Sequence, residues 1–253
     1  MARIRTGYRE VMEHAMSHDA TAHQTSTEPT DHSLMMPTLD AFGAFEILYA
    51  EVNDFENNCY VIVDIESGET CIVDAADNAP AIVRLVDAAR TRAVTAERAD
   101  VHPIAIVTTH AHHDHWGALA ECKQHYSVPS IAGAADAAGI PIGSDRTVVD
   151  GDTIRIGTHD ITVIGLRGHT PGSIALLLEQ DGEVPRLITG DSLFPGGPGK
   201  TSTDAEFTSL MDDLEARVFN KLPDDTIVYP GHGASTTLGA ERPHLAEWRE
   251  RGW

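Results

Sequence analysis

The sequence has few basic side chains. Lysine and arginine together number 18 against 39 aspartates and glutamates, which leaves a formal net charge of −21 at pH 7. A chain this acidic repels phosphate backbones and anionic membrane surfaces. We therefore expect neither nucleic acid nor a membrane as a partner.

Cysteines and long apolar runs are also scarce. The three cysteines form no CxxC pair and no ladder of disulfide spacing, which favours a reducing compartment, and Cys59 and Cys71 lie in apolar runs typical of buried strands. No apolar run approaches the roughly 18–20 residues of a membrane span. The basic N-terminus is not followed by the apolar stretch of a secretory signal. These absences predict a cytoplasmic protein.

Residues 1 to about 40 are polar, rich in threonine, serine and histidine, and lack a clear hydrophobic period. We interpret residues 1–40 as an N-terminal extension that is flexible or partly helical. No linker rich in proline, glycine or serine divides the remainder, so residues 41–253 are expected to form one domain.

Apolar runs with strand-like and helix-like spacing alternate along that domain. In the first half we expect a helix over 79–97, another over 117–126, and strands over 45–52, 59–64, 70–73, 104–108 and 128–132. In the second half we expect helices over 204–222 and 243–251, and strands over 147–149, 153–156, 160–166, 173–178, 187–189 and 226–229. Two runs of strands, each followed by helices, predict an α/β fold with two sheets packed face to face and helices outside.

Four polar clusters follow strand-like runs directly. The first is Thr109-His110-Ala111-His112-His113-Asp114-His115, and the others surround His169, Asp191 and His232. Imidazole and carboxylate groups are ligands that zinc and similar divalent ions favour. In a tightly turned segment, His110 and His112 can point one way while Asp114 and His115 turn toward a second position, so one run can supply two metals.

This order of motifs, HxHxDH followed by GHT, GD and GHG, resembles the metallo-β-lactamase superfamily from about residue 45 to residue 253. The resemblance implies a four-layer αββα sandwich with two mixed sheets, helices on the outer faces and the site at one edge. It implies two divalent ions, expected to be zinc, with iron or manganese as alternatives. By motif position it implies that Asp191 bridges a first metal bound by His110, His112 and His169 and a second bound by Asp114, His115 and His232.

Two segments narrow the resemblance. Residues 57–64 (Asn-Asn-Cys-Tyr-Val-Ile-Val-Asp) and 190–194 (Gly-Asp-Ser-Leu-Phe) look like the glyoxalase II-like branch, which cleaves thioesters. True zinc β-lactamases commonly carry a cysteine, or no carboxylate, where this chain has Asp191. Glyoxalase II enzymes continue into a helical region that helps to bind glutathione, whereas this sequence stops at Trp253, and their Cys-Gly-Arg run appears here as Pro198-Gly199-Lys200. The glutathione thioester is therefore not carried over as the expected substrate.

The resemblance implies a hydrolase that cleaves a thioester or a lactone or ester bond of a small molecule with a metal-bridging hydroxide. Asp114 and Asp191 are then the catalytic carboxylates. Three further residues have two interpretations each. His113 either lines the pocket or supports a metal ligand, or else binds a metal itself. Asp74 either forms a hydrogen bond with the far ring nitrogen of a ligating histidine or only begins a turn or helix. Lys200 either recognises an anion or is an ordinary surface lysine.

Three other functions remain open from the sequence. Persulfide dioxygenases resemble the same fold and use one iron, for which the ligands here would be His110, His169 and Asp191, although residues 192–197 lack the Arg-Gly-Cys-Gly-Arg run of that family. A phosphodiesterase or nuclease of the superfamily is disfavoured by the net charge of −21. A metal-binding scaffold without activity is the third alternative.

Overall fold

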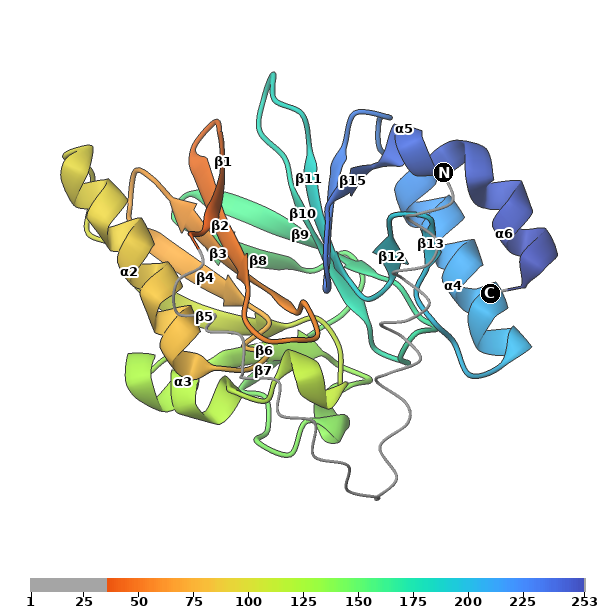
Figure 1. The fold of residues 1–253 in the computed structure, drawn as a ribbon, viewed down its shortest axis with the longest axis horizontal. Coiled ribbons are helices and arrows are strands. Elements are labelled where there is room, and N and C mark those ends of the chain that lie inside the picture. The colour runs from red at the N-terminus through yellow and green to blue at the C-terminus, as the bar shows by residue number, and fades with distance from the viewer. Residues whose placement is uncertain (1–35, 253) are drawn as a thin grey trace.

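A computed structural model describes residues 36–252. Two large sheets form its centre, with helices on both outer sides (Figure 1). The first sheet has seven strands in sequence order: β1 (Thr38–Phe42), β2 (Phe45–Glu51), β3 (Asn58–Asp64), β4 (Glu69–Val73), β5 (His102–Thr108), β6 (Ser130–Gly133) and β7 (Arg146–Val148). The second has six strands in the order β15 (Thr236–Thr237), β14 (Ile227–Pro230), β11 (Arg186–Gly190), β10 (Ile174–Leu178), β9 (His159–Gly165) and β8 (Thr153–Ile156).

Both sheets are mixed. In the first, the pairs from β1 to β4 are antiparallel and the pairs from β4 to β7 are parallel. In the second, β11 and β14 are parallel and the other neighbours are antiparallel. A further pair, β12 (Leu193–Phe194) and β13 (Gly197–Pro198), closes a small hairpin directly after Asp191.

Period-two alternation in the strands produces the layers. On β3, Cys59, Val61 and Val63 pack toward the helices of the first sheet, whereas Tyr60 and Ile62 pack between the two sheets. On β10, Leu176 and its alternate neighbours likewise face the first sheet, and Ala175 and Leu177 face the other helices. Full burial of each such aliphatic side chain stabilises the fold by about 1.5–3 kcal/mol. The predicted four-layer αββα sandwich is confirmed.

The helices cover the two outer faces. α2 (Ala79–Thr95) and α3 (Leu119–Tyr126) lie over the first sheet, and α4 (Asp204–Asp213), α5 (Leu238–Glu241) and α6 (Leu245–Arg251) lie over the second (Figure 1). α2 starts at Asn78, whose side chain accepts a hydrogen bond from the backbone N–H of Ala81. Ile82, Leu85, Val86 and Ala89 form its buried face. Within residues 36–252, no helix combines the length and apolarity needed to cross a bilayer.

Some expected boundaries were wrong. β1 begins at Thr38, so residues 38–40, assigned to the extension, pair with β2 instead, and Phe42 is buried beside Phe45. The helix expected over 204–222 is α-helical only to Asp213 and continues as a π-helix over Leu214–Phe219. The last helix opens with a 3₁₀ turn, Arg242–His244, before α6. The prediction for residues 1–35 lies outside the described residues.

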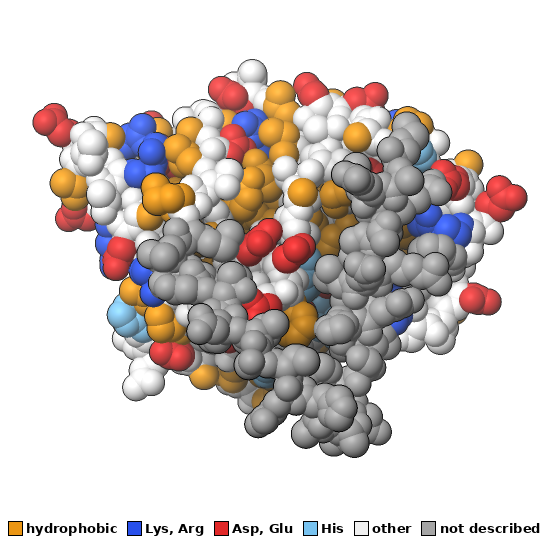
Figure 2. Space-filling model, in the orientation of Figure 1, with side chains coloured by type: hydrophobic (Ala, Val, Ile, Leu, Met, Phe, Trp, Pro, Cys, Tyr) orange, Lys and Arg blue, Asp and Glu red, His pale blue; other side chains and the backbone are white. Residues whose placement is uncertain are grey.

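The acidic excess is visible on the surface. Figure 2 shows one face, on which acidic side chains lie near the middle and basic side chains lie mostly towards the sides.

All three cysteines are free and buried, as the apolar runs around Cys59 and Cys71 predict.

Candidate metal centre

The loops after β5, β9, β11 and β14 meet at one edge of the two sheets, and they carry all seven predicted ligands. Ligand atoms lie within 4.8 Å of one another in three groups. The groups are His110, His112 and His169; Asp114, His115 and His232; and His110, His115 and Asp191. The first two are the sets that the family resemblance assigns to two metals, and the third shares residues with both.

Asp191 lies at the centre of this cluster. Its Oδ2 is 3.6 Å from Nε2 of His169 and 3.5 Å from Nε2 of His232, and its Oδ1 is 3.4 Å from Nε2 of His115. Nε2 of His110 lies 3.9 Å from Oδ2. One carboxylate therefore faces imidazoles of both sets, which is the position that a bridging ligand requires.

The cluster is largely buried, and its charges compensate one another. Burial alone would raise the pKa of Asp191, but the neighbouring His115 and His232 hold it well below the usual range. Burial opposes a charge on His115, but Asp191 and Asp74 outweigh it and raise the pKa of His115 well above its usual range. The same balance between burial and Asp191 raises the pKa of His232 to about 10. These groups thus favour positive charge among them, from protons or from metal ions.

Hydrogen bonds orient most of the imidazoles. Nδ1 of His169 lies 2.7 Å from the backbone oxygen of Lys200, and Nδ1 of His232 lies 2.7 Å from the backbone oxygen of Phe55. Nδ1 of His115 lies 2.9 Å from Oδ2 of Asp74. Each partner only accepts, so Nδ1 carries a proton and donates it, which directs Nε2 toward the cluster.

His110 and His112 complete the first set. Thr109 donates its hydroxyl proton to Asp74 (2.8 Å), so its oxygen accepts from Nδ1 of His110 (3.1 Å). Nε2 of His110 is thereby directed into the site, and Nδ1 of His112 lies 3.1 Å from it. The His110 side chain is 1% exposed, whereas His112 is an exposed residue at the rim.

Two unpaired buried atoms test whether these residues fit a metal. Nε2 of His169 and Oδ1 of Asp191 are buried and have no hydrogen-bond partner among residues 36–252. An unpaired buried polar atom is costly in a native protein unless something else satisfies it. Because both atoms point into a group of imidazoles and carboxylates, a divalent ion fits the donor set.

Asp74 has the contact that the sequence suggested for it. Its side chain is fully buried and accepts from the backbone N–H of Thr109 (2.7 Å) and the hydroxyl of Thr109, as well as from His115. Its backbone is left-handed, with φ 56°, which aspartate and asparagine tolerate better than most residues. This conformation turns the carboxylate back from the end of β4 toward the site.

His113 and Lys200 do not join the cluster. The exposed ring of His113 packs against Trp116, with ring centroids 4.6 Å apart, and lies outside all three ligand groups. Lys200 has an exposed side chain, and its contact with the site is made by its backbone oxygen. The interpretation of His113 as a neighbour of the ligands fits this placement better than ligation does.

The sequence did not indicate Asp136, which lies in the loop after β6. Its buried carboxylate accepts from the backbone N–H of Ala111 (2.8 Å), the backbone N–H of Gly172 (2.6 Å) and the hydroxyl of Thr170 (2.5 Å). It therefore joins the segment of His110 and His112 to the loop of His169. Its flanking residues are small and unremarkable, so no pattern marked it.

Asn57 lies in the segment 57–64 that resembles the glyoxalase II-like branch, but no sequence pattern indicated a role for it at the site. Its side-chain amide donates to the backbone oxygen of Asp114 (3.0 Å) and to Oδ2 of Asp114 (3.2 Å). The same nitrogen lies 3.3 Å from Nε2 of His232. Asn57 thus contacts two of the three residues in the second set.

Gly231 keeps the cluster free of another side chain. A Cβ at this position would lie 2.1 Å from Oδ1 of Asp191 and 2.6 Å from Cε1 of His115. Neither group can move without leaving the cluster, so only glycine fits here. This requirement explains one glycine of the Gly-His-Gly motif.

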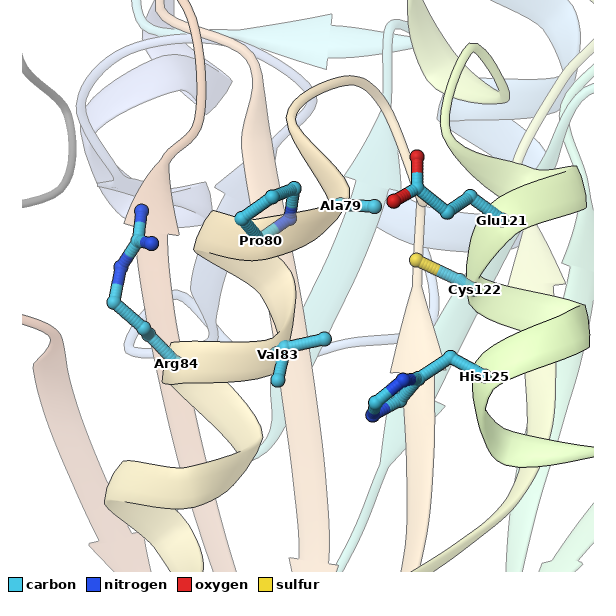
Figure 3. Close-up of a pocket in the computed structure, with 7 residues that line it drawn as sticks. All are labelled: Ala79, Pro80, Val83, Arg84, Glu121, Cys122 and His125. Atoms are coloured by element: carbon cyan, nitrogen blue, oxygen red, sulfur yellow. The ribbon is translucent and has the colours of Figure 1, made fainter.

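A separate pocket of about 390 Å³ lies between α2 and α3 (Figure 3). Pro80, Val83 and Arg84 line it from one helix, and Glu121, Cys122 and His125 line it from the other. None of the site residues predicted from the sequence lines this pocket. The pocket therefore shares no lining residue with the histidine and aspartate cluster at the sheet edge.

Among solved structures, the chain is similar to the BLEG-1 B3 metallo-beta-lactamase (25% identity, TM-score 0.65, covering 78% of this chain and 96% of that one). It is also similar to ETHE1 from Myxococcus xanthus (25%, TM-score 0.60, 83% of each chain) and to TTHA1623 in a di-iron-bound form (25%, TM-score 0.56, 82% of this chain and 97% of that one).

Curated relatives point the same way. The chain is 31% identical to an uncharacterized protein of Aquifex aeolicus over 73% of its own length and 88% of that protein. It is 28% identical to the hydroxyacylglutathione hydrolase GloC of Haemophilus influenzae, covering 76% of this chain and 92% of that enzyme. It is 33% identical to the hydroxyacylglutathione hydrolase of Erwinia tasmaniensis, covering 70% of this chain but only 62% of that enzyme.

The family model of the metallo-beta-lactamase superfamily matches residues 52–232. Fold, site and sequence agree: the chain belongs to the metallo-beta-lactamase superfamily of metal-dependent hydrolases.

Proposed function

We propose that this chain is a cytoplasmic hydrolase with two divalent ions, preferably zinc, that cleaves a thioester or a lactone or ester bond of a small molecule. The observation that carries the proposal is the central position of Asp191, whose two oxygens face Nε2 atoms from both ligand sets at 3.4–3.6 Å. Relatives named hydroxyacylglutathione hydrolase support the thioester class.

The residues divide into two sets in this proposal. His110, His112 and His169 would hold the first ion, Asp114, His115 and His232 would hold the second, and Asp191 faces both sets. At neutral pH a bound pair of divalent ions supplies a hydroxide nucleophile and a Lewis acid for the carbonyl oxygen.

The two carboxylates have different tasks because their exposure differs. The Asp191 side chain is 7% exposed and the Asp114 side chain is 40% exposed. Asp191 therefore fixes the spacing of the two sets, whereas Asp114 reaches solvent and can accept a hydrogen bond from a water molecule at the site. A thiol has a pKa of about 8.5, so a thiolate leaves without a strong general acid. This suits a site whose charged groups are all committed to ligation.

The proposal is tested by Asp191→Ala together with metal analysis. We expect about two zinc ions per wild-type chain, about one or fewer in the variant, and a loss of activity of about three orders of magnitude, since the interaction serves the transition state directly. Turnover is measured with a panel of small thioesters, lactones, a β-lactam and a phosphodiester. Near-wild-type turnover in the variant would contradict the dinuclear mechanism, and preference for the phosphodiester would contradict the substrate class.

A mononuclear persulfide dioxygenase is the second candidate. It is favoured by one observation: Oδ2 of Asp191 lies within 3.9 Å of Nε2 of both His110 and His169, the ligands that such a site would use. One iron per chain, with oxygen consumption on a persulfide and no thioester cleavage, would establish this alternative. Two ions per chain with hydrolysis and no oxygen consumption would exclude it.

A further inference from the structure

Asn57 is a fully buried amide that directly precedes β3 and lies beside the second ligand set. Its Nδ2 contacts the backbone oxygen and Oδ2 of Asp114 and lies 3.3 Å from Nε2 of His232. The backbone of Asn57 also pairs with that of His232 in an isolated antiparallel bridge. The backbone and the side chain of Asn57 therefore both hold His232 close to Asn57.

The orientation of the amide follows from its partners. Both partner atoms on Asp114 are acceptors, so the NH₂ group must face them and the amide oxygen must face away. That oxygen, Oδ1, is buried and has no hydrogen-bond partner within the part of the chain that the structure describes. The chain thus leaves one buried polar atom unsatisfied in order to place the amide donors against Asp114, which indicates a role beyond filling space.

Within the second set, Asp114 needs such support most. The Asp114 side chain is 40% exposed and the His232 side chain is 15% exposed, whereas those of His115 and Asp191 are 0% and 7% exposed. Packing alone does not hold Asp114 in place, because much of its side chain contacts solvent. Hydrogen bonds must therefore limit its rotamers. Asn57 supplies one of them, to Oδ2, and its other bond holds the backbone oxygen of the same residue.

We propose that Asn57 is a positioning residue for the second metal position, and that its contacts with Asp114 and His232 set the affinity of that position. The inference rests on the two-ion function proposed above. Asn57 does not bind an ion itself. It holds a carboxylate and an imidazole at the same corner, so that less motion is lost when an ion binds there.

The test is a zinc titration of the metal-free full-length chain. Binding is measured by calorimetry and, independently, by competition with a chromogenic chelator. In Asn57→Ala, we expect the second binding step to weaken about 10- to 100-fold, the usual effect of losing a partner behind a ligand. The first step should stay within about threefold, because His110, His112 and His169 do not contact Asn57.

Asn58 provides the matched control. It is 2% exposed, lies next in the chain, and donates to the backbone oxygens of Pro230 (3.1 Å) and Gly233 (2.8 Å) without contacting a ligand side chain. Asn58→Ala should lower the melting temperature to a similar extent and keep the second step within about threefold of wild type.

The outcomes separate the two proposals. A wild-type chain that binds one ion overturns the two-ion function, and this inference with it. A wild-type chain that binds two ions, with an unchanged second step in Asn57→Ala, overturns the role of Asn57 alone. Equal weakening of the second step in Asn57→Ala and Asn58→Ala also overturns it, since the cause would then be the loop and not the amide.

Discussion

The two sheets present their ligands in different ways. The first sheet supplies His110, His112, Asp114 and His115 from one continuous run after β5, and the carboxylates of Asp74 and Asp136 hold that run in place. The second sheet supplies its ligands from separate strand ends: His169, Asp191 and His232. There the orienting partners of the two histidines are backbone oxygens, those of Lys200 and Phe55.

This difference determines where substitutions act. A carboxylate partner is removed by changing one side chain, whereas a carbonyl partner persists whatever residue occupies its position. We therefore expect the ligands of the first sheet to be sensitive to changes at their hydrogen-bond partners. Those of the second sheet should be sensitive mainly to changes in loop conformation.

Among changes at the hydrogen-bond partners of the ligands, the largest effect is expected for Asp74→Asn. The NH₂ group of asparagine would face either the backbone N–H of Thr109 or Nδ1 of His115, both of which donate to Asp74. If it faces His115, the imidazole must shift its proton to Nε2 and loses the lone pair that a metal needs. We expect metal affinity and activity to fall about 10- to 100-fold, measured by zinc titration and initial rates.

Asp64→Asn is the matched control for that variant. Asp64 is also a buried carboxylate at the end of a strand, and it accepts from Nδ1 of His159 at 2.7 Å and from Ser67. No ligand group includes it. Asp64→Asn should reduce thermal stability and leave zinc affinity unchanged; equal losses of affinity in both variants would refute the special role of Asp74.

A smaller effect is expected for Asp40→Asn, which tests a contact between the sheets that involves no ligand. Asp40 on β1 accepts from Nε of Arg186 (2.8 Å) and from the hydroxyl of Tyr229 (2.6 Å), both on the second sheet. Burial raises the pKa of Asp40, but the hydrogen bonds from Arg186 and Tyr229 outweigh it, so the net pKa is lowered.

Because the pKa of Asp40 is lower in the folded state, ionised Asp40 contributes to stability above its unfolded-state pKa of about 3.9. That contribution to stability is lost as the pH falls through the pKa of Asp40 in the folded state. The variant should melt a few degrees below wild type at pH 7, since about 1 kcal/mol shifts Tm by roughly 2–4 °C in a chain of this size. The difference should shrink near pH 3. Circular dichroism melts of both proteins decide this, and an equal difference at both pH values would argue against the charged form of Asp40.

The smallest effect is expected for Lys200→Ala. The carbonyl that accepts from Nδ1 of His169 belongs to the main chain and survives the substitution. Zinc affinity should stay within about threefold of wild type, because the partner behind the ligand is intact. A large rise in KM with unchanged metal content would instead assign the ammonium group to an anionic substrate, as the sequence allows.

The ligands could be predicted from the sequence because they are chemically distinctive side chains that cluster in short motifs. His110 to His115 form one run, and the order of the remaining motifs resembles a family. Asp136 and Asn57 could not be predicted as site residues from the sequence. Asp136 acts mainly on backbone N–H groups distant in the chain, and such contacts leave no mark in a residue pattern.

The fold was predictable to the extent that burial governs it. β3 and β10 are fully buried and were expected almost to the residue. β1 was missed because Thr38 and Leu39 are exposed on an edge strand, so pairing with β2 rather than burial defines it. The change from α- to π-helix at Leu214 was also missed, since the apolar face of that helix continues through both parts.

Each proposed ligand set draws on both sheets, and this bears on the order of events in folding. His110 and His169, or His115 and His232, come together only after the sandwich has closed, because the chain between them must first form several strands. Closing such long loops is slow and entropically costly, and an ion that needs the closed geometry cannot assist in reaching it. Bound metal would therefore act chiefly as a barrier to unfolding, lengthening the lifetime of the native state while leaving the rate of folding largely unchanged.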